Sequence, residues 1–158
     1  MRMFLWNILL ALVWAAMIGA MTPVHILTGF VLAYIALLLA RPITGPSVYF
    51  SKTRQAAGFL LWFAWQMLVS NARVAYDVVT PGHNARPGVV AIPMEAETPL
   101  EITLLANLVT LTPGTLSLDV SDDQKTLYIH AMFMDGGAED LRREIKDGLE
   151  KRLLELLR

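Results

Sequence analysis

The first forty residues are almost entirely apolar. From Met3 to Ala40 the chain has no Asp, Glu, Lys or Arg, and Arg2 and Arg41 flank this run. A single straight helix over the run would be about 57 Å long at 1.5 Å per residue, whereas the hydrocarbon core of a bilayer is about 30 Å thick. Pro23 interrupts a helical hydrogen-bond ladder, and Thr22 can cap a following helix. The pattern predicts a transmembrane helical hairpin over residues 1–40.

A cleaved signal peptide is the alternative explanation for this segment. Arg2, an apolar stretch and Gly19-Ala20 form a loose version of that pattern. However, the second apolar run, residues 24–40, follows at once with no polar mature sequence between the two runs. That continuity favours the hairpin.

The next segment, residues 41–54, contains two prolines, one glycine and three bases. This composition predicts a basic cytoplasmic loop, since Lys and Arg are retained on the cytoplasmic side of membranes. Both ends of the hairpin would then be cytoplasmic and its tip would lie outside.

Residues 55–79 predict an amphipathic helix. Its polar positions recur at spacings of four, three and four, which places them in one stripe: Gln66, Ser70, Arg73 and Asp77. The opposite face is apolar and comprises Phe59, Phe63, Met67, Val74 and Val78. Arg73 and Asp77 are four residues apart and can pair.

Two placements of this helix remain open. It can lie at the membrane interface, which leaves the rest of the chain in the cytoplasm. Alternatively, it can be a third membrane helix with its polar stripe turned into a bundle, which places the rest outside. The bases Arg73 and Arg86 favour the cytoplasmic placement under the positive-inside rule.

The remainder predicts a turn-rich linker, residues 80–88, and a small α+β domain, residues 89–158. A short apolar strand over 89–92 precedes a capping box, in which Thr98 and Glu101 open a helix that runs to about Leu111. Two strands over 116–120 and 126–133 flank a polar loop, and a helix with a leucine-rich stripe follows residues 135–137. The fold class is therefore a membrane hairpin plus an amphipathic helix, followed by a β-α-β-β-α cytoplasmic domain.

Charge is distributed very unequally along the chain. The 158 residues carry 14 acids and 13 bases, yet residues 1–76 contain no acid at all. An ion carrier needs an acid or a lysine deep within a membrane span. Because the hairpin contains neither, this chain is not expected to hold a proton or a sodium ion in the membrane by itself.

No pattern of catalytic, cofactor-binding or metal-binding residues is present. There is no cysteine, and His25, His83 and His130 have no spacing that joins them into a metal site. Asp119, Asp122 and Asp123 lack the spaced ligands of a calcium loop. We therefore expect neither an enzyme nor a nucleic-acid-binding protein, and no cofactor.

The segment from Asn107 to Val120 (NLVTLTPGTLSLDV), followed by Leu127-Tyr-Ile-His-Ala131, resembles the E subunit of Mrp-type multisubunit cation/proton antiporters. The similarity extends to the plan of the whole chain. This resemblance implies an accessory or structural subunit of a Na⁺(K⁺)/H⁺ antiporter in the bacterial cell membrane, which supports assembly without an ion site of its own. It also implies that the partners are other antiporter subunits and the lipid bilayer, with no small-molecule substrate.

Two sets of contacts follow as hypotheses. The TLTPGT region is a candidate subunit contact, although a helix cap explains its Pro-Gly pair equally well; its residues are Asn107, Thr110, Thr112, Pro113, Gly114 and Thr115. Small residues of the hairpin are expected to pack against neighbouring subunits: Ala11, Ala15, Gly19, Gly29, Ala33 and Ala36. A stand-alone membrane-anchored binding or sensor domain is the alternative function.

Overall fold

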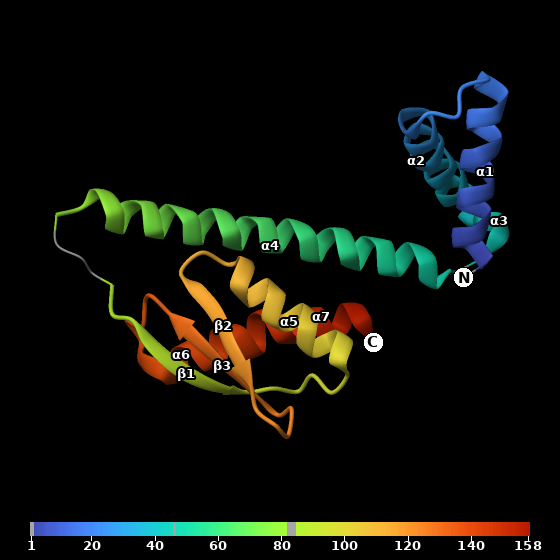
Figure 1. Ribbon diagram of the computed structural model, residues 1–158. Helices are drawn as coiled ribbons and strands as arrows, with labels where there is room; N and C mark the ends of the chain where they lie inside the picture. The colour runs from blue at the N-terminus through green and yellow to red at the C-terminus, as the bar shows by residue number, and fades with distance from the viewer. Residues whose placement is uncertain (1, 46, 82–84) are drawn as a thin grey trace. The chain divides into compact units, whose positions relative to one another are not determined.

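The computed structural model describes residues 2–45, 47–81 and 85–158, and the chain divides into two compact units. Unit 1 is Met1–Gln55 and unit 2 is Ala56–Arg158. Figure 1 shows the elements of each unit. Residues 82–84 of the predicted linker, which include His83, lie outside the described ranges.

Unit 1 is built on a pair of helices, α1 (Arg2–Ile18) and α2 (Pro23–Leu39). Pro23 is the first residue of α2, and the side chain of Thr22 accepts a hydrogen bond from the backbone N–H of His25. The predicted break and cap at Thr22-Pro23 are therefore confirmed. Among the described residues, none of the helices combines the length and the apolar character needed to cross a membrane.

The small residues of the hairpin are used within the hairpin itself. Ala11, Ala15 and Ala33 are buried, and so is Gly29. A Cβ added at Gly29 would lie 2.8 Å from the carbonyl oxygen of Ala11, so the two backbones approach too closely for a side chain there. The expectation that these four residues face neighbouring subunits is wrong, because α1 and α2 bury them against each other.

The prediction of a loop over residues 41–54 is also wrong. The segment contains a short helix, α3 (Arg41–Thr44), and the start of a long one, α4 (Val48–Val79). Tyr34 of α2 explains the early start of α4, because its ring packs edge-on against Tyr49 and Phe50 and its hydroxyl lies 2.9 Å from that of Thr53. These contacts stabilise the first turns of α4 as a helix.

Unit 2 contains a three-stranded antiparallel sheet in the order β1-β3-β2. Its strands are β1 (Gly88–Pro93), β2 (Thr115–Val120) and β3 (Thr126–Ala131). Helix α5 (Pro99–Leu111) lies between β1 and β2 in the chain, and the C-terminal helix follows as α6 (Gly137–Arg143), η1 (Glu144–Glu150) and α7 (Lys151–Leu157). The predicted order β-α-β-β-α is confirmed.

One face of the sheet is buried and the other is exposed. The buried face presents Val90, Ile92, Leu127, Ile129 and Ala131 to the helices. In β2 the polar Ser117 points toward α5, where its hydroxyl donates to the carbonyl of Ala106, while Leu116 and Leu118 are exposed. A bulge between Ser117 and Asp119 then returns Val120 to the buried face.

The C-terminal helix has a π-helical centre, η1, which the sequence pattern did not predict. Its buried positions, Leu141, Ile145, Leu149 and Leu153, recur every four residues. That spacing overshoots a 3.6-residue turn by about 40° at each step. The wider π turn absorbs the overshoot and keeps all four side chains directed at the core.

Helix α4 packs along unit 2 through its predicted apolar face. Phe59 and Phe63 are buried in the same core as the sheet and helix residues, and their rings stack with centroids 6.2 Å apart. Trp62 lies under the guanidinium of Arg152, 4.7 Å from the ring centroid. From Ala56 onward, α4 is therefore an integral part of the α+β unit (Figure 1).

Two buried carboxylates secure the connection between β1 and α5. Glu150 is 1% exposed, and its Oε1 accepts the backbone N–H of Ala96 at 2.9 Å and that of Glu95 at 2.5 Å. Glu101 forms the predicted capping box with Thr98, which is confirmed. Backbone N–H groups donate to both side chains, which offsets part of the cost of burying them, while Oε2 of Glu150 has no hydrogen-bond partner among the described residues.

Candidate functional site

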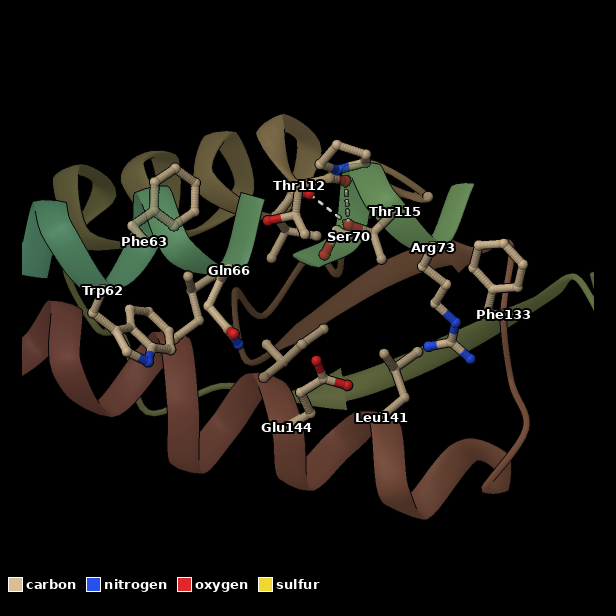
Figure 2. A pocket seen from close by; sticks show the side chains of 15 residues that line it. Trp62, Phe63, Gln66, Ser70, Arg73, Thr112, Thr115, Phe133, Leu141 and Glu144 are labelled. Atoms are coloured by element: carbon tan, nitrogen blue, oxygen red, sulfur yellow. Dashed lines mark hydrogen bonds between the residues drawn. The ribbon is translucent and has the colours of Figure 1, made fainter. Parts of the chain in front are cut away.

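A cavity of about 90 Å³ lies beneath α4 in unit 2 (Figure 2). Its walls come from α4, from the end of α5 with the turn that follows, from Phe133 beyond β3, and from α6 and η1. The space is large enough for a small cluster of ordered water molecules when polar groups line it. It brings together two groups of residues that the sequence singled out separately.

The first group is the polar stripe of α4. Gln66, Ser70 and Arg73 line the cavity, and Asp77, one turn further along, is 3% exposed. The stripe therefore faces the α+β domain of its own chain. Phe59, a residue of the predicted apolar face, is buried in the core of the same domain. The expectation that the stripe and the apolar residues occupy opposite faces is therefore wrong, because Phe59 and Asp77 are 18 residues apart, which is five full turns, and lie on the same side of the helix.

The second group is the turn between α5 and β2. Thr112, Pro113, Gly114 and Thr115 all line the cavity. Gly114 has φ +88, a conformation that favours glycine and ends the helix as predicted.

The hydroxyls of this turn are engaged by their own backbone. Thr112 donates to the carbonyl of Leu108, and Thr115 Oγ1 lies 2.6 Å from the carbonyl oxygen of Val109. These bonds satisfy carbonyls at the end of α5. The threonines thus have a capping role, which leaves less of their hydrogen-bonding capacity for a partner.

The other two members of the predicted contact set lie away from the cavity. Asn107 and Thr110 are exposed on α5. The hydroxyl of Thr110 accepts the backbone N–H of Ser117 at 3.2 Å and so caps part of the free edge of β2. The structure brings Thr112 to Thr115 together with the α4 stripe, and separates Asn107 and Thr110 from it.

Arg73 makes two electrostatic contacts at the cavity wall. It forms an ion pair with Asp135, and its guanidinium lies 4.5 Å from the ring centroid of Phe133. The possible pair with Asp77 is therefore replaced by a pair with Asp135, because the turn after β3 brings Asp135 beside α4. Both side chains are about half exposed, so this pair contributes little to stability by itself.

Three polar side chains project into the remaining space: the amide of Gln66, the hydroxyl of Ser70 and the carboxylate of Glu144 (Figure 2). Across residues 2–45, 47–81 and 85–158, none of the three takes part in a side-chain hydrogen bond or ion pair. Their donors and acceptors are available to water or to another small polar molecule.

The cavity does not assemble a reactive group. Among the described residues no histidine lines the cavity, and Ser70 forms no hydrogen bond with the carboxylate of Glu144, whereas a nucleophile requires a base in hydrogen-bond contact. In the described part of the chain, no three His, Asp or Glu side chains are placed to hold a metal ion. The arrangement can bind and order polar molecules, and its residues do not form a catalytic set.

Sequence reasoning did not identify Trp62, Phe133 and Glu144 as cavity residues. They come from α4, from the segment after β3 and from η1, which are far apart in the chain. Gly148 gave no signal either, because a Cβ added there would lie 3.8 Å from the Trp62 ring, which is an ordinary van der Waals contact. No periodic pattern links these positions.

The chain matches known proteins over nearly its full length. The sequence profile of a family described as Na⁺/H⁺ ion antiporter subunit matches residues 7–156. The Na⁺/H⁺ antiporter E subunit of Alkalihalophilus pseudofirmus is 34% identical over 152 residues, covering 96% of each chain. The corresponding E subunit of Bacillus subtilis is 34% identical over 154 residues, covering 98% of this chain and 97% of its relative.

Two solved structures are also similar. A chain of the Mrp complex from Dietzia sp. DQ12-45-1b is 34% identical, with a TM-score of 0.51, and the match covers 65% of this chain and 96% of that one. A chain of the membrane-bound sulfane sulfur reductase, an archaeal respiratory membrane complex, is 26% identical with a TM-score of 0.58 and 98% coverage of both chains.

The helical hairpin, the α+β unit and these similarities define a component of a multisubunit membrane transporter. The chain belongs to the Na⁺/H⁺ ion antiporter subunit family. The resemblance to the E subunits of Mrp-type antiporters, carried by the TLTPGT segment, is confirmed.

Proposed function

We propose that this chain is an accessory subunit of a multisubunit Na⁺(K⁺)/H⁺ antiporter, which supports assembly and antiport without an ion site of its own. The observation that carries this proposal is the absence of any Asp or Glu from the first 76 residues. Ion paths through membranes depend on ionisable side chains in the spans. A chain without them contributes to antiport by holding other subunits in place.

The hairpin is the proposed membrane anchor. Its uncharged run and its outward side chains support this placement, since large apolar residues such as Leu5, Met17 and Leu27 are exposed around α1 and α2. Helices α1 and α2 have 17 residues each, at the short end of the range of about 17–25 residues that is usual for membrane spans. Such helices suit a hydrocarbon core of about 30 Å when the flanking residues reach the interface.

The α+β domain is proposed to lie on the cytoplasmic side of the bacterial cell membrane. Arg2 precedes the hairpin, and Arg41, Lys52 and Arg54 follow it, with no charged residue at its tip. This distribution satisfies the positive-inside rule with both ends of the hairpin in the cytoplasm.

Contacts with other subunits are proposed to use the exposed side of α5. Leu100, Asn107 and Leu111 lie on one face of that helix at spacings of seven and four, and the two leucines are 63% and 56% exposed. The turn from Thr112 to Thr115 borders the end of this face. Exposed apolar side chains in a row support a contact surface, whereas the threonine hydroxyls are directed at their own backbone.

Co-purification tests the subunit assignment. The tagged chain, expressed with the other genes of its complex and extracted in mild detergent, is expected to retain large polytopic partners. Leu100→Ser combined with Leu111→Ser should reduce their recovery, whereas Glu97→Ser, an exposed neighbour, should not. Recovery of the wild-type chain as a monomer would contradict the proposal and favour a stand-alone sensor domain.

Cysteine labelling tests the topology, because the chain has no native cysteine. Asp122→Cys places a single thiol in the exposed β2–β3 hairpin, and Met21→Cys places one at the exposed tip of the α1–α2 hairpin. A membrane-impermeant reagent added to intact cells should label Met21→Cys only. Labelling of Asp122→Cys would overturn the cytoplasmic placement.

A further inference from the structure

Helix α4 has an outward face that the packing of unit 2 leaves uncovered. Its inward side carries the buried phenylalanines, Phe59 and Phe63, and the polar stripe. The opposite side is exposed over about five turns and carries large apolar side chains: Leu60, Leu61, Trp65, Leu68, Val69 and Tyr76. Leu61 is 74% exposed and Trp65 is 63% exposed. We call these six residues the outer face of α4.

The outer face carries no charge. From Ala56 to Ala72 the chain contains no Asp, Glu, Lys or Arg. Asn71, the polar residue beside this face, turns its amide back to the carbonyl of Met67 at 2.8 Å. Arg73, just beyond, is directed at Asp135 on the domain side. An exposed apolar surface of this length on a folded unit marks a site that something else covers.

We propose that the outer face of α4 lies flat on a lipid surface, in the boundary between headgroups and acyl chains, with the α+β domain beneath it in water. This inference rests on the membrane location given under the proposed function. It reverses the interfacial placement expected from the sequence, because the face containing Phe59 and Phe63 contacts the domain and the opposite face contacts lipid.

Lipid fits this surface for three reasons. Helix α4 begins at Val48, close in the chain to the end of the hairpin at Leu39, so its start is tied to the proposed anchor. The bases Lys52 and Arg54 precede the outer face, and no acid accompanies them, which suits an anionic membrane surface. Trp65 and Tyr76 have amphipathic rings, which favour the headgroup region.

The packing of unit 2 excludes the alternative of a spanning α4. The inward side from Phe59 to Arg73 is covered by a domain with exposed charges, including Glu144 and Asp135. If this stretch crossed the bilayer, those charges would enter the hydrocarbon, where each is costly. A helix covered on one side and apolar on the other matches a surface orientation.

Depth measurements by spin labelling test the proposal in the complex recovered by co-purification and placed in lipid nanodiscs. Labels are attached at Leu61→Cys, Leu68→Cys and Tyr76→Cys, with Asp122→Cys as the water-exposed control. Relaxation by oxygen, which enters lipid, is compared with relaxation by a water-soluble nickel chelate. We expect the three α4 labels to favour oxygen and to lie at similar shallow depths, and the control label to favour nickel.

Three results would overturn the proposal. A spanning helix would place the labels at 61 and 76 about 22 Å apart in depth, from 1.5 Å per residue. A partner protein on the face would shield the labels from both reagents. A water-exposed face would make them as accessible to nickel as the control. If co-purification yields no complex, the proposed function fails first, and the same labels are measured on the full chain reconstituted alone in vesicles.

A second measurement uses native side chains. Trp62 and Trp65 are three residues apart, but Trp62 is covered by Arg152 while Trp65 belongs to the outer face. In full chains that keep only one tryptophan, with the others replaced by Phe, lipids brominated near the headgroup should quench Trp65 at least twofold more than Trp62. Equal quenching of the two would contradict the proposal.

Discussion

Arg158 and Glu101 join the end of the C-terminal helix to the first turn of α5, with Arg158 Nε donating to Glu101 Oε1 across 3.1 Å. The same carboxylate accepts the backbone N–H groups of Glu97 and Thr98. The hydrogen bond from Arg158, followed by the two backbone bonds, lowers the pKa of Glu101 to about 2. In return, Glu101 raises the pKa of Arg158.

The lowered pKa of Glu101 predicts an acid-dependent loss of stability. Because the folded-state pKa lies below the unfolded value of about 4.5, the contribution is fully present above pH 4.5 and is lost as the pH falls toward 2. Thermal unfolding of the full chain in detergent, followed by circular dichroism, should show this decline. Glu101→Gln should flatten it, whereas Glu97→Gln, an exposed neighbour, should leave it unchanged. An identical acid profile for Glu101→Gln would contradict the assignment.

The docking of α4 on the α+β domain depends on Phe63. Phe63→Ala removes a ring from the shared core and should lower the free energy of unfolding of this unit by about 3–5 kcal/mol. Leu68→Ala, on the outer face of the same helix, should change it by less than about 0.5 kcal/mol in detergent. Urea unfolding monitored by tryptophan fluorescence measures both. Equal effects would mean that α4 does not pack on the domain through this side.

Two helical glycines give a matched test of hairpin packing. At Gly29 an added Cβ would lie 2.8 Å from Ala11 O and 2.9 Å from the Trp14 ring, whereas at Gly58 it would meet nothing within 4 Å. Gly29→Ala should therefore destabilise the hairpin by about 1–3 kcal/mol through overpacking. Gly58→Ala should stabilise α4 by about 0.5–1 kcal/mol, because alanine is the better helix former. Melting temperatures of the two variants in detergent should move in opposite directions.

Glu150 anchors the segment that connects β1 to α5. Glu150→Ala leaves the buried N–H group of Ala96 and the partly buried one of Glu95 without an acceptor and should cost about 2–4 kcal/mol. Glu150→Gln keeps one acceptor oxygen and should cost less. Asp147→Ala, an exposed position on the same π-helical segment, serves as the control and should be nearly neutral. Urea unfolding ranks the three variants, and a neutral Glu150→Ala would contradict the anchoring role.

Local signals predicted the elements of the chain well. Thr22-Pro23 marked the start of α2, and the capping box of Thr98 and Glu101 marked the start of α5, because caps are encoded within a few neighbouring residues. Gly114 marked the end of α5 for the same reason. The early start of α4 was missed, because Tyr34 stabilises it from another helix.

The candidate site depended on contacts that no local pattern encodes. The stripe of α4 and the TLTPGT turn were each visible in the sequence, yet their meeting in one cavity requires α4 to pack across α5 and η1. Arg73 illustrates the difference. Its sequence neighbour Asp77 was a possible partner, whereas Asp135, 62 residues away, forms the pair.

By itself, the sequence determined the charge-free hairpin, the order of strands and helices, and the family. These depend on hydrophobic period, caps and residue type, which act over short distances. Tertiary structure alone decided which face of α4 is buried. Both faces carry apolar residues, so hydrophobic pattern does not choose between them; the choice is made by Phe59 and Phe63, which complete the core of the α+β domain and leave Leu61 and Trp65 outside.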